Sequence, residues 1–141
     1  MIFEKVVKNF TRYGLRVEDV RRYLDVGGDI NHRDQKLDWS LLHYAAEDCN
    51  SEAIRLLVAH GADLAATDRN GWTPLHLAVD SDLDTSGRHG RRATRLSTVH
   101  TLIGLGADET ARTTDGATPR DIAIAYGQEV FYDSLLRPGA D

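Results

Sequence analysis

Three carboxylates alternate along one short segment and could form an oxygen-rich metal site. Asp80, Asp82 and Asp84 have the spacing of the first, third and fifth positions of a calcium-binding loop. Such a loop also needs a glycine at its sixth position and a bidentate glutamate at its twelfth. This chain has Thr85 and Arg91 at those places. The spacing therefore predicts a solvated acidic loop without a bound metal.

The histidines and the cysteine lack the neighbours that metal binding or nucleophilic catalysis requires. His43 and His76 have no second ligand at a spacing such as His-Glu-x-x-His. Cys49 is the single cysteine, so it forms no internal disulfide, and no paired base can be identified for it. An enzyme or small-ligand protein would have to use the segment 80–95, where the available residues are Asp80, Asp82, Asp84 and His89. A loop gives such residues no rigid support, so we expect no catalytic activity, metal or cofactor.

A basic cluster follows the carboxylates in the same segment: Arg88, Arg91, Arg92 and Arg95. It is either a solvated loop that runs into a helix or a contact for the acidic surface of a partner, and both interpretations remain open. Nucleic-acid binding is a third interpretation. The net charge of −5 argues against it, because a nucleic-acid-binding protein normally presents a basic face.

Two short signatures recur along the chain at a nearly constant interval. Gly-Ala-Asp begins at Gly61, Gly106 and Gly139, with a near copy at Gly27, and these glycines are 34, 45 and 33 residues apart. A second signature begins at the hydroxyl residues Ser40, Thr73 and Thr118, which are 33 and 45 residues apart. The long interval exceeds the common one by 12 residues. We interpret the difference as an insertion at about 82–93 in an otherwise regular repeat.

Each unit of this repeat has the pattern of two short helices. Thr73 is a good N-cap residue and Pro74 suits the first helical position, so a first helix is predicted to start there. Apolar residues at intervals of three and four then predict the buried faces of two second helices: Ile54, Leu57 and Val58; Val99, Leu102 and Ile103. Gly61 and Gly106 follow where such helices need a left-handed residue to end.

A period near 33 built on Thr-Pro-Leu-His and Gly-Ala-Asp resembles the ankyrin repeat. The resemblance implies an all-α solenoid of helix-turn-helix units joined by β-turn or hairpin loops. It implies one domain over residues 1–141, with four repeats at about 1–37, 38–70, 71–115 and 116–141, of which the first and last are capping repeats. It also implies that His43 and His76 form hydrogen bonds between neighbouring turns.

The same resemblance places a partner-binding surface on the concave side of the stack. Trp39 and Trp72 each precede the first helix of a unit, at a position that faces this side in ankyrin proteins. Aromatic residues are enriched among the residues that dominate binding energy. The repeat frame adds Arg33, Arg69, Asn70, Arg112 and Asp115 on the turns, and Glu47, Asp48, Asp80 and Tyr126 at the ends of first helices. The insertion would contribute Arg88, Arg91 and Arg92.

The expected function is therefore non-catalytic binding of one folded partner protein. One alternative is a dedicated inhibitor of a single enzyme, of the immunity-protein or antitoxin type. A lesser alternative is a small-ligand or enzymatic role for the 80–95 loop. The chain has no apolar run that could span a membrane and no signal-peptide pattern, so we expect a cytoplasmic monomer with no membrane contact.

Overall fold

The computed structural model describes residues 2–8, 14–83 and 96–136. Over these residues it contains eight helices and no strand, which confirms the all-α class. The helices are α1 (Ile2–Lys8), α3 (Val17–Asp25), α4 (Leu41–Glu47), α5 (Ser51–Ala59), α6 (Pro74–Leu83), α7 (Ser97–Gly104), α8 (Pro119–Ala125) and α9 (Glu129–Leu136). They pack as the antiparallel pairs α1–α3, α4–α5, α6–α7 and α8–α9.

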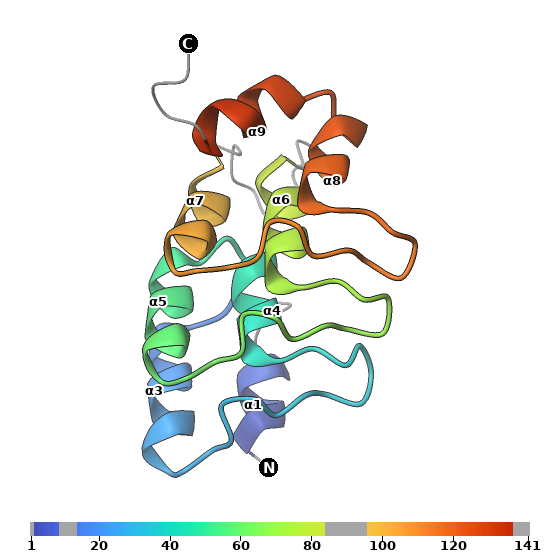
Figure 1. Cartoon of the computed structure of the whole chain (residues 1–141). Coiled ribbons are helices and arrows are strands. Elements are labelled where there is room, and N and C mark those ends of the chain that lie inside the picture. Colours follow the sequence, from blue (N-terminus) through green and yellow to red (C-terminus); the bar gives the residue numbers. More distant parts are fainter. Residues whose placement is uncertain (1, 9–13, 84–95, 137–141) are drawn as a thin grey trace.

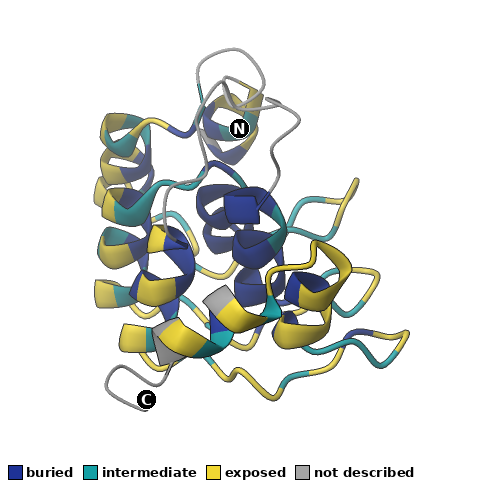
Figure 2. Ribbon diagram, turned by 90° about the horizontal axis from the view of Figure 1, so that it is seen from above, coloured by how far each residue is buried: buried dark blue, intermediate teal, exposed yellow. Residues whose placement is uncertain are grey.

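The pairs stack into two columns. In Figure 1 the first helices α1, α4, α6 and α8 lie on the side from which the long turns project, and α3, α5, α7 and α9 form the other column. Within the columns α4 packs on α6, α6 on α8 and α5 on α7. Viewed from above, the buried residues gather where the columns meet and the exposed ones face outward (Figure 2). None of the described helices is long and apolar enough to cross a membrane.

The core uses the faces expected from the sequence. Leu57 and Leu102 of the second helices are completely buried, and Val99 is 1% exposed. Small residues on the first helices, among them Ala45 and Ala78, are also fully buried, which lets the helices approach closely. The last first helix differs, because Ile124 is 43% exposed where Ala46 and Val79 of the inner units are fully buried.

The turn before each first helix contains a residue in the left-handed backbone region. Gly71 and Gly116 have φ values of 76° and 84°. Asp38 holds the equivalent place in the turn that lacks a glycine, and its φ is 59°. Aspartate tolerates this region better than most residues because its short polar side chain bonds locally. The turn before α4 therefore reaches the same conformation without glycine.

The first residues of the predicted insertion lie in helix α6. The helix continues through Asp82 and Leu83, and both residues are buried, at 5% and 8% exposure. The Asp82 carboxylate accepts the backbone N–H groups of Thr98 and Val99, at 3.0 and 3.1 Å, and so caps the start of α7 from the neighbouring helix. Asp82 and Leu83 therefore belong to the packed core, although the period of the repeat assigns them to the insertion.

Candidate functional site

The projecting turns are closed by repeated backbone hydrogen bonds. Asp68 donates its N–H to the carbonyl of Trp72 at 3.0 Å, and Thr113 donates in the same way to Ala117 at 2.8 Å. Neighbouring turns are also joined, since the Thr114 N–H donates to the Asn70 carbonyl at 3.0 Å. The turns therefore form a connected row along one side of the first helices.

Two buried histidines hold each turn to the next one. The Nε2 atom of His43 lies 3.0 Å from the Trp72 carbonyl oxygen, and Nε2 of His76 lies 3.0 Å from that of Ala117. Nδ1 of His43 accepts the backbone N–H of Ser40 at 3.2 Å, so Nε2 carries the proton and donates it to the carbonyl. These bonds confirm the linking role expected for both histidines.

Burial makes these imidazoles hard to protonate. It lowers the pKa of His43 below its usual value, and the hydrogen bond to the Trp72 carbonyl opposes the shift in part. The pKa of His76 is lowered for the same reason, with the Ala117 carbonyl opposing. Both ring nitrogens of each histidine already have hydrogen-bond partners within the stack, so His43 and His76 act as neutral structural links.

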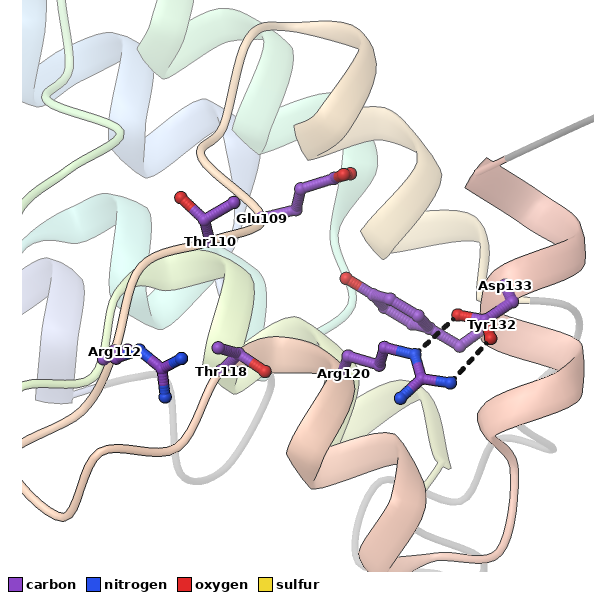
Figure 3. A pocket seen from close by; sticks show the side chains of 7 residues that line it. All are labelled: Glu109, Thr110, Arg112, Thr118, Arg120, Tyr132 and Asp133. Atoms are coloured by element: carbon purple, nitrogen blue, oxygen red, sulfur yellow. Dashed lines mark hydrogen bonds and ion pairs between the residues drawn. The ribbon is translucent and has the colours of Figure 1, made fainter.

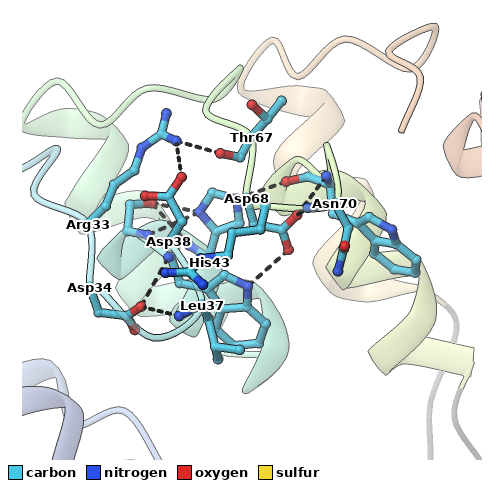
Figure 4. A network of polar contacts seen from close by, with 12 residues as sticks. Arg33, Asp34, Leu37, Asp38, His43, Thr67, Asp68 and Asn70 are labelled. Atoms are coloured by element: carbon cyan, nitrogen blue, oxygen red, sulfur yellow. Dashed lines mark hydrogen bonds and ion pairs between the residues drawn. The ribbon is translucent and has the colours of Figure 1, made fainter. Parts of the chain in front are cut away.

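Asp68 bonds to the indole of Trp39 and to the backbone of Trp72. One of its carboxylate oxygens accepts the indole N–H of Trp39 at 3.0 Å. The other accepts the backbone N–H groups of Asn70 and Trp72, each at 2.9 Å. Figure 4 shows Asp68 at the centre of this network, with Arg33 and Asp38 paired at 3.2 Å beside it. Because Trp39 and Asp68 belong to neighbouring turns, the network also sets the distance between those turns.

Six of the residues predicted to bind a partner line one groove of about 390 Å³: Trp39, Trp72, Arg69, Asn70, Glu47 and Asp80. Lys36, Leu37, Asp68 and Leu77 complete its lining. Both tryptophans are half-buried, and Leu37 is 41% exposed. We call this site the tryptophan groove. It has the composition of an interface centre, with aromatic residues surrounded by polar ones.

The floor of the tryptophan groove carries carboxylates that bond to the next unit. Glu47 accepts the Ser81 hydroxyl at 2.8 Å, and Asp80 accepts the Tyr126 hydroxyl at 2.7 Å. Ser81 is 5% exposed and Tyr126 is 38% exposed. The predicted site residues Glu47, Asp80 and Tyr126 therefore lie along one line of inter-unit contacts at the ends of the first helices.

Asp48 was predicted to face a partner, and the structure corrects this. It is 8% exposed, and its carboxylate accepts the Leu15 N–H at 3.0 Å. A side chain on Gly14 would lie within 3 Å of that carboxylate. Asp48 is thus a buried acceptor that joins the first two helix pairs, and the repeat frame missed this because Leu15 lies in a distant connecting segment.

Three other predicted residues within the described part of the chain, Arg33, Asp115 and Arg112, do not line the tryptophan groove. Arg33 binds Asp38 and the Thr67 carbonyl at the side of its turn, and Asp115 is exposed at the tip of another. Arg112 lines a separate pocket together with Arg120 and Tyr132. In that pocket Arg120 donates two hydrogen bonds of 2.8 Å to Asp133 (Figure 3). The predicted contacts Arg88, Arg91 and Arg92 fall outside the described residues.

The repeat frame also places the turn residues Lys36 and Leu37 toward the concave side, so two residues of the tryptophan groove were not predicted from the sequence. Leu77 contributes part of the lining although it is only 6% exposed. Asp68 could have been recognised, since Asp34 occupies a similar place in the preceding turn, but the extra residue in that turn shifts its spacing. The described residues contain no cluster of three potential metal ligands. Two of the alternating carboxylates have different environments. Asp82 is buried and caps a helix, whereas Asp80 lines the tryptophan groove.

The comparisons with known proteins agree with the helix pairs. A family model of ankyrin repeats in three copies matches residues 11–88, and a model of the single ankyrin repeat matches residues 70–114. Together they reach across the units that form the tryptophan groove.

Similar proteins have varied overall functions. Protein phosphatase 1 regulatory subunit 27 of Mus musculus is 38% identical over 81 residues, which are 57% of this chain and 45% of that protein. Protein fem-1 homolog A of Homo sapiens is 38% identical over 77 residues, 54% of this chain and 12% of that protein. Palmitoyltransferase AKR1 of Lachancea kluyveri is 27% identical over 151 aligned positions, 89% of this chain and 20% of that protein. The chain spans less than half the length of each relative.

Proposed function

Because this chain belongs to the ankyrin repeat family, we propose that it is a non-catalytic protein that binds one folded partner through the concave side of its helix stack. The repeats themselves indicate protein interaction. The finer proposal rests on one observation, which is that two half-buried tryptophans and six polar residues from neighbouring units line a single groove.

The tryptophan groove is preorganised for such a role. Its tryptophans are held by Asp68 and its turns by His43 and His76, so little side-chain freedom would be lost on binding. The regulatory subunit named above is a relative whose name states a role in controlling an enzyme. That relationship supports a regulatory binding role here, with the partner to be identified by experiment.

The experiment compares two charge reversals in the full chain. Arg69→Glu changes the tryptophan groove, and Arg55→Glu makes the same change on the exposed surface of α5 as a matched control. Tagged wild type and both variants, each checked for helical circular dichroism, are used to capture proteins from a lysate of the source cell. We expect one stoichiometric partner that is retained by Arg55→Glu and lost with Arg69→Glu.

Retention of every captured protein by Arg69→Glu would contradict the proposal. If the partner is an enzyme, its activity in the purified complex separates inhibition from scaffolding. Light scattering on the free chain and on the complex measures whether a monomer binds one partner molecule, as we propose.

A further inference from the structure

A second pocket lies at the N-terminal end of the stack, between α1, α3 and the segment that follows α3 (Figure 1). It has a volume of about 460 Å³ and shares no lining residue with the tryptophan groove. We call it the N-terminal pocket. Its lining consists of Phe3, Glu4, Tyr23, Val26, Gly27, Gly28, Asp29 and His32. A pocket of this size has room for a side chain of another molecule.

Aromatic rings form one wall of the N-terminal pocket. Phe3 lies edge-on to Tyr23, with ring centres 5.9 Å apart, and edge-on to His32 at 4.4 Å. The Tyr23 hydroxyl donates to the Asp29 carbonyl at 2.6 Å, and a side-chain carbon on Gly28 would lie 2.5 Å from the Tyr23 ring. The wall therefore has a fixed position before any ligand binds.

Val26 adds exposed apolar surface to the same pocket. It directly follows the last residue of α3 and is 62% exposed. The two residues after it are glycines, which have no side chains to cover the valine. An aliphatic chain that entered the pocket would therefore bury Val26 and be stabilised by the apolar area removed from water.

The charge at the pocket is negative. No lysine or arginine is among the described residues that line it. The exposed carboxylate of Asp29 accepts the backbone N–H of Asn31 at 3.0 Å, and in the described part of the chain no cation pairs with it. Burial raises the pKa of Tyr23, and the charge of Asp29 raises it further, so this charge acts within the pocket. A positive ligand group beside Asp29 is therefore favoured.

A lysine side chain combines the two properties that the N-terminal pocket requires. Its aliphatic stem packs on apolar surface while its ammonium group remains at a polar edge. One oxygen of Asp29 already accepts the Asn31 N–H. An ammonium group needs a single oxygen, whereas the guanidinium fork of arginine bonds best to both oxygens of a carboxylate. The carboxylate therefore suits lysine better than arginine.

We propose that the N-terminal pocket receives a lysine side chain of a partner protein, with its stem against Val26 and the aromatic wall and its ammonium group paired with Asp29. This inference goes beyond the function proposed above, because it assigns a binding role to a surface outside the tryptophan groove.

The test titrates the full ¹⁵N-labelled chain with Nα-acetyl-lysine amide. The backbone N–H signals of Gly27 and Gly28 report the pocket directly, because both residues line it. Nα-acetyl-norleucine amide has the same stem without the ammonium group, and Nα-acetyl-arginine amide carries the guanidinium fork. We expect saturable shifts with the lysine compound, weaker binding of the arginine compound, and binding of the norleucine compound that is about fivefold weaker.

A matched pair of variants assigns the charge. Asp29→Asn removes the charge and keeps an oxygen that can accept the Asn31 N–H. Asp63 lies 34 residues later and does not line the pocket, and its carboxylate accepts the Ala65 N–H at 2.9 Å in the same way. Asp29→Asn should weaken lysine binding about fivefold and leave norleucine binding unchanged, whereas Asp63→Asn should change neither.

Four results would each overturn the inference. They are the absence of saturable shifts at Gly27 and Gly28, equal binding of the norleucine and lysine compounds, tighter binding of the arginine compound, and unchanged lysine binding in Asp29→Asn. The capture experiment with Arg69→Glu tests the tryptophan groove separately. A partner lost with Arg69→Glu, together with a failed lysine titration, would overturn only the lysine inference, and the reverse pair of results would overturn only the proposed function.

Discussion

The imidazole of His43 lies 3.0 Å from the carbonyl oxygen of Trp72, which lies two residues before the first helix of the next unit. The His43 side chain thus caps the N-terminus of its own helix by accepting the Ser40 N–H. It also holds the turn that carries Trp72, the second tryptophan of the groove. The same arrangement joins His76 to Ala117. Stability of the stack and geometry of the candidate site therefore depend on the same two residues.

Replacing His43 with alanine should destabilise the chain by about 1–3 kcal/mol. The change removes the imidazole that donates to the Trp72 carbonyl, and with it a side chain that is fully buried. Urea unfolding followed by circular dichroism measures the effect. His100→Ala, at an exposed position of α7, is the control and should change little. Equal losses in the two variants would contradict the linking role.

Stability should decrease as the pH falls below about 6.5, the ordinary pKa of histidine. The pKa values of His43 and His76 are lowered in the folded chain, so the unfolded chain binds protons first as the pH falls. Their contribution is complete above the unfolded pKa and is lost as the pH falls through the folded values.

Unfolding free energies measured at a series of pH values from about 7.5 to about 5.0 give the slope of stability against pH. Burial raises the pKa of Asp82, which contributes with the opposite sign, so wild type must be compared with a His43→Gln, His76→Gln variant. The variant should show a smaller loss of stability over this range. An identical slope would mean that other groups cause the pH dependence.

Replacing Asp82 with alanine should destabilise the chain by about 1–2 kcal/mol, because the start of α7 loses its acceptor. Asp82→Asn keeps one oxygen and should cost less. Thermal melting compares the two variants. A deletion of residues 84–93 should be tolerated better than one of residues 82–93, which also removes buried Leu83. No difference between the deletions would show that the cap is dispensable.

Gly71→Ala should destabilise the chain more than Gly116→Ala. Both glycines have positive φ, so either change costs about 1–2 kcal/mol of backbone strain. A side-chain carbon on Gly71 would also lie 2.6 Å from the Thr114 backbone nitrogen, whereas one on Gly116 would meet nothing within 4 Å. Chemical denaturation of both variants tests the difference, and a larger loss for Gly116→Ala would contradict it.

The periodic features were the ones that sequence could predict. The fully buried Leu57 and Leu102, and the bonds made by His43 and His76, follow from residues that recur at fixed intervals. The shared groove of Trp39 and Trp72 follows in the same way, because equivalent positions of stacked units face the same side. Repetition supplies several examples of each position, so one irregular unit does not hide the pattern.

Contacts that break the period could not be predicted. Asp82 bonds to Thr98 across the insertion, and Asp48 bonds to Leu15 in a connecting segment. Each depends on where an irregular segment meets the stack, which the period of the repeat does not predict. The backbone conformation of Asp38 departs less from the repeat. Asp38 has the left-handed conformation that glycine has in the other turns, and it directly precedes Trp39 as Gly71 directly precedes Trp72.

The neighbour-to-neighbour packing of the helix pairs has a consequence for how the chain opens. Because α8 packs on α6 and α4 packs on α6, the middle pair is supported from two sides, whereas α8 and α9 are supported chiefly from one. In the last unit Asp121 occupies the position that His43 and His76 occupy in the inner units. Its carboxylate accepts the backbone N–H of Thr118, at the start of its own helix. The pair α1–α3 is likewise supported from one side only. Amide hydrogen exchange should therefore be graded, faster in the two end pairs than in α6, so that opening proceeds inward from the ends as a sequence of separate steps.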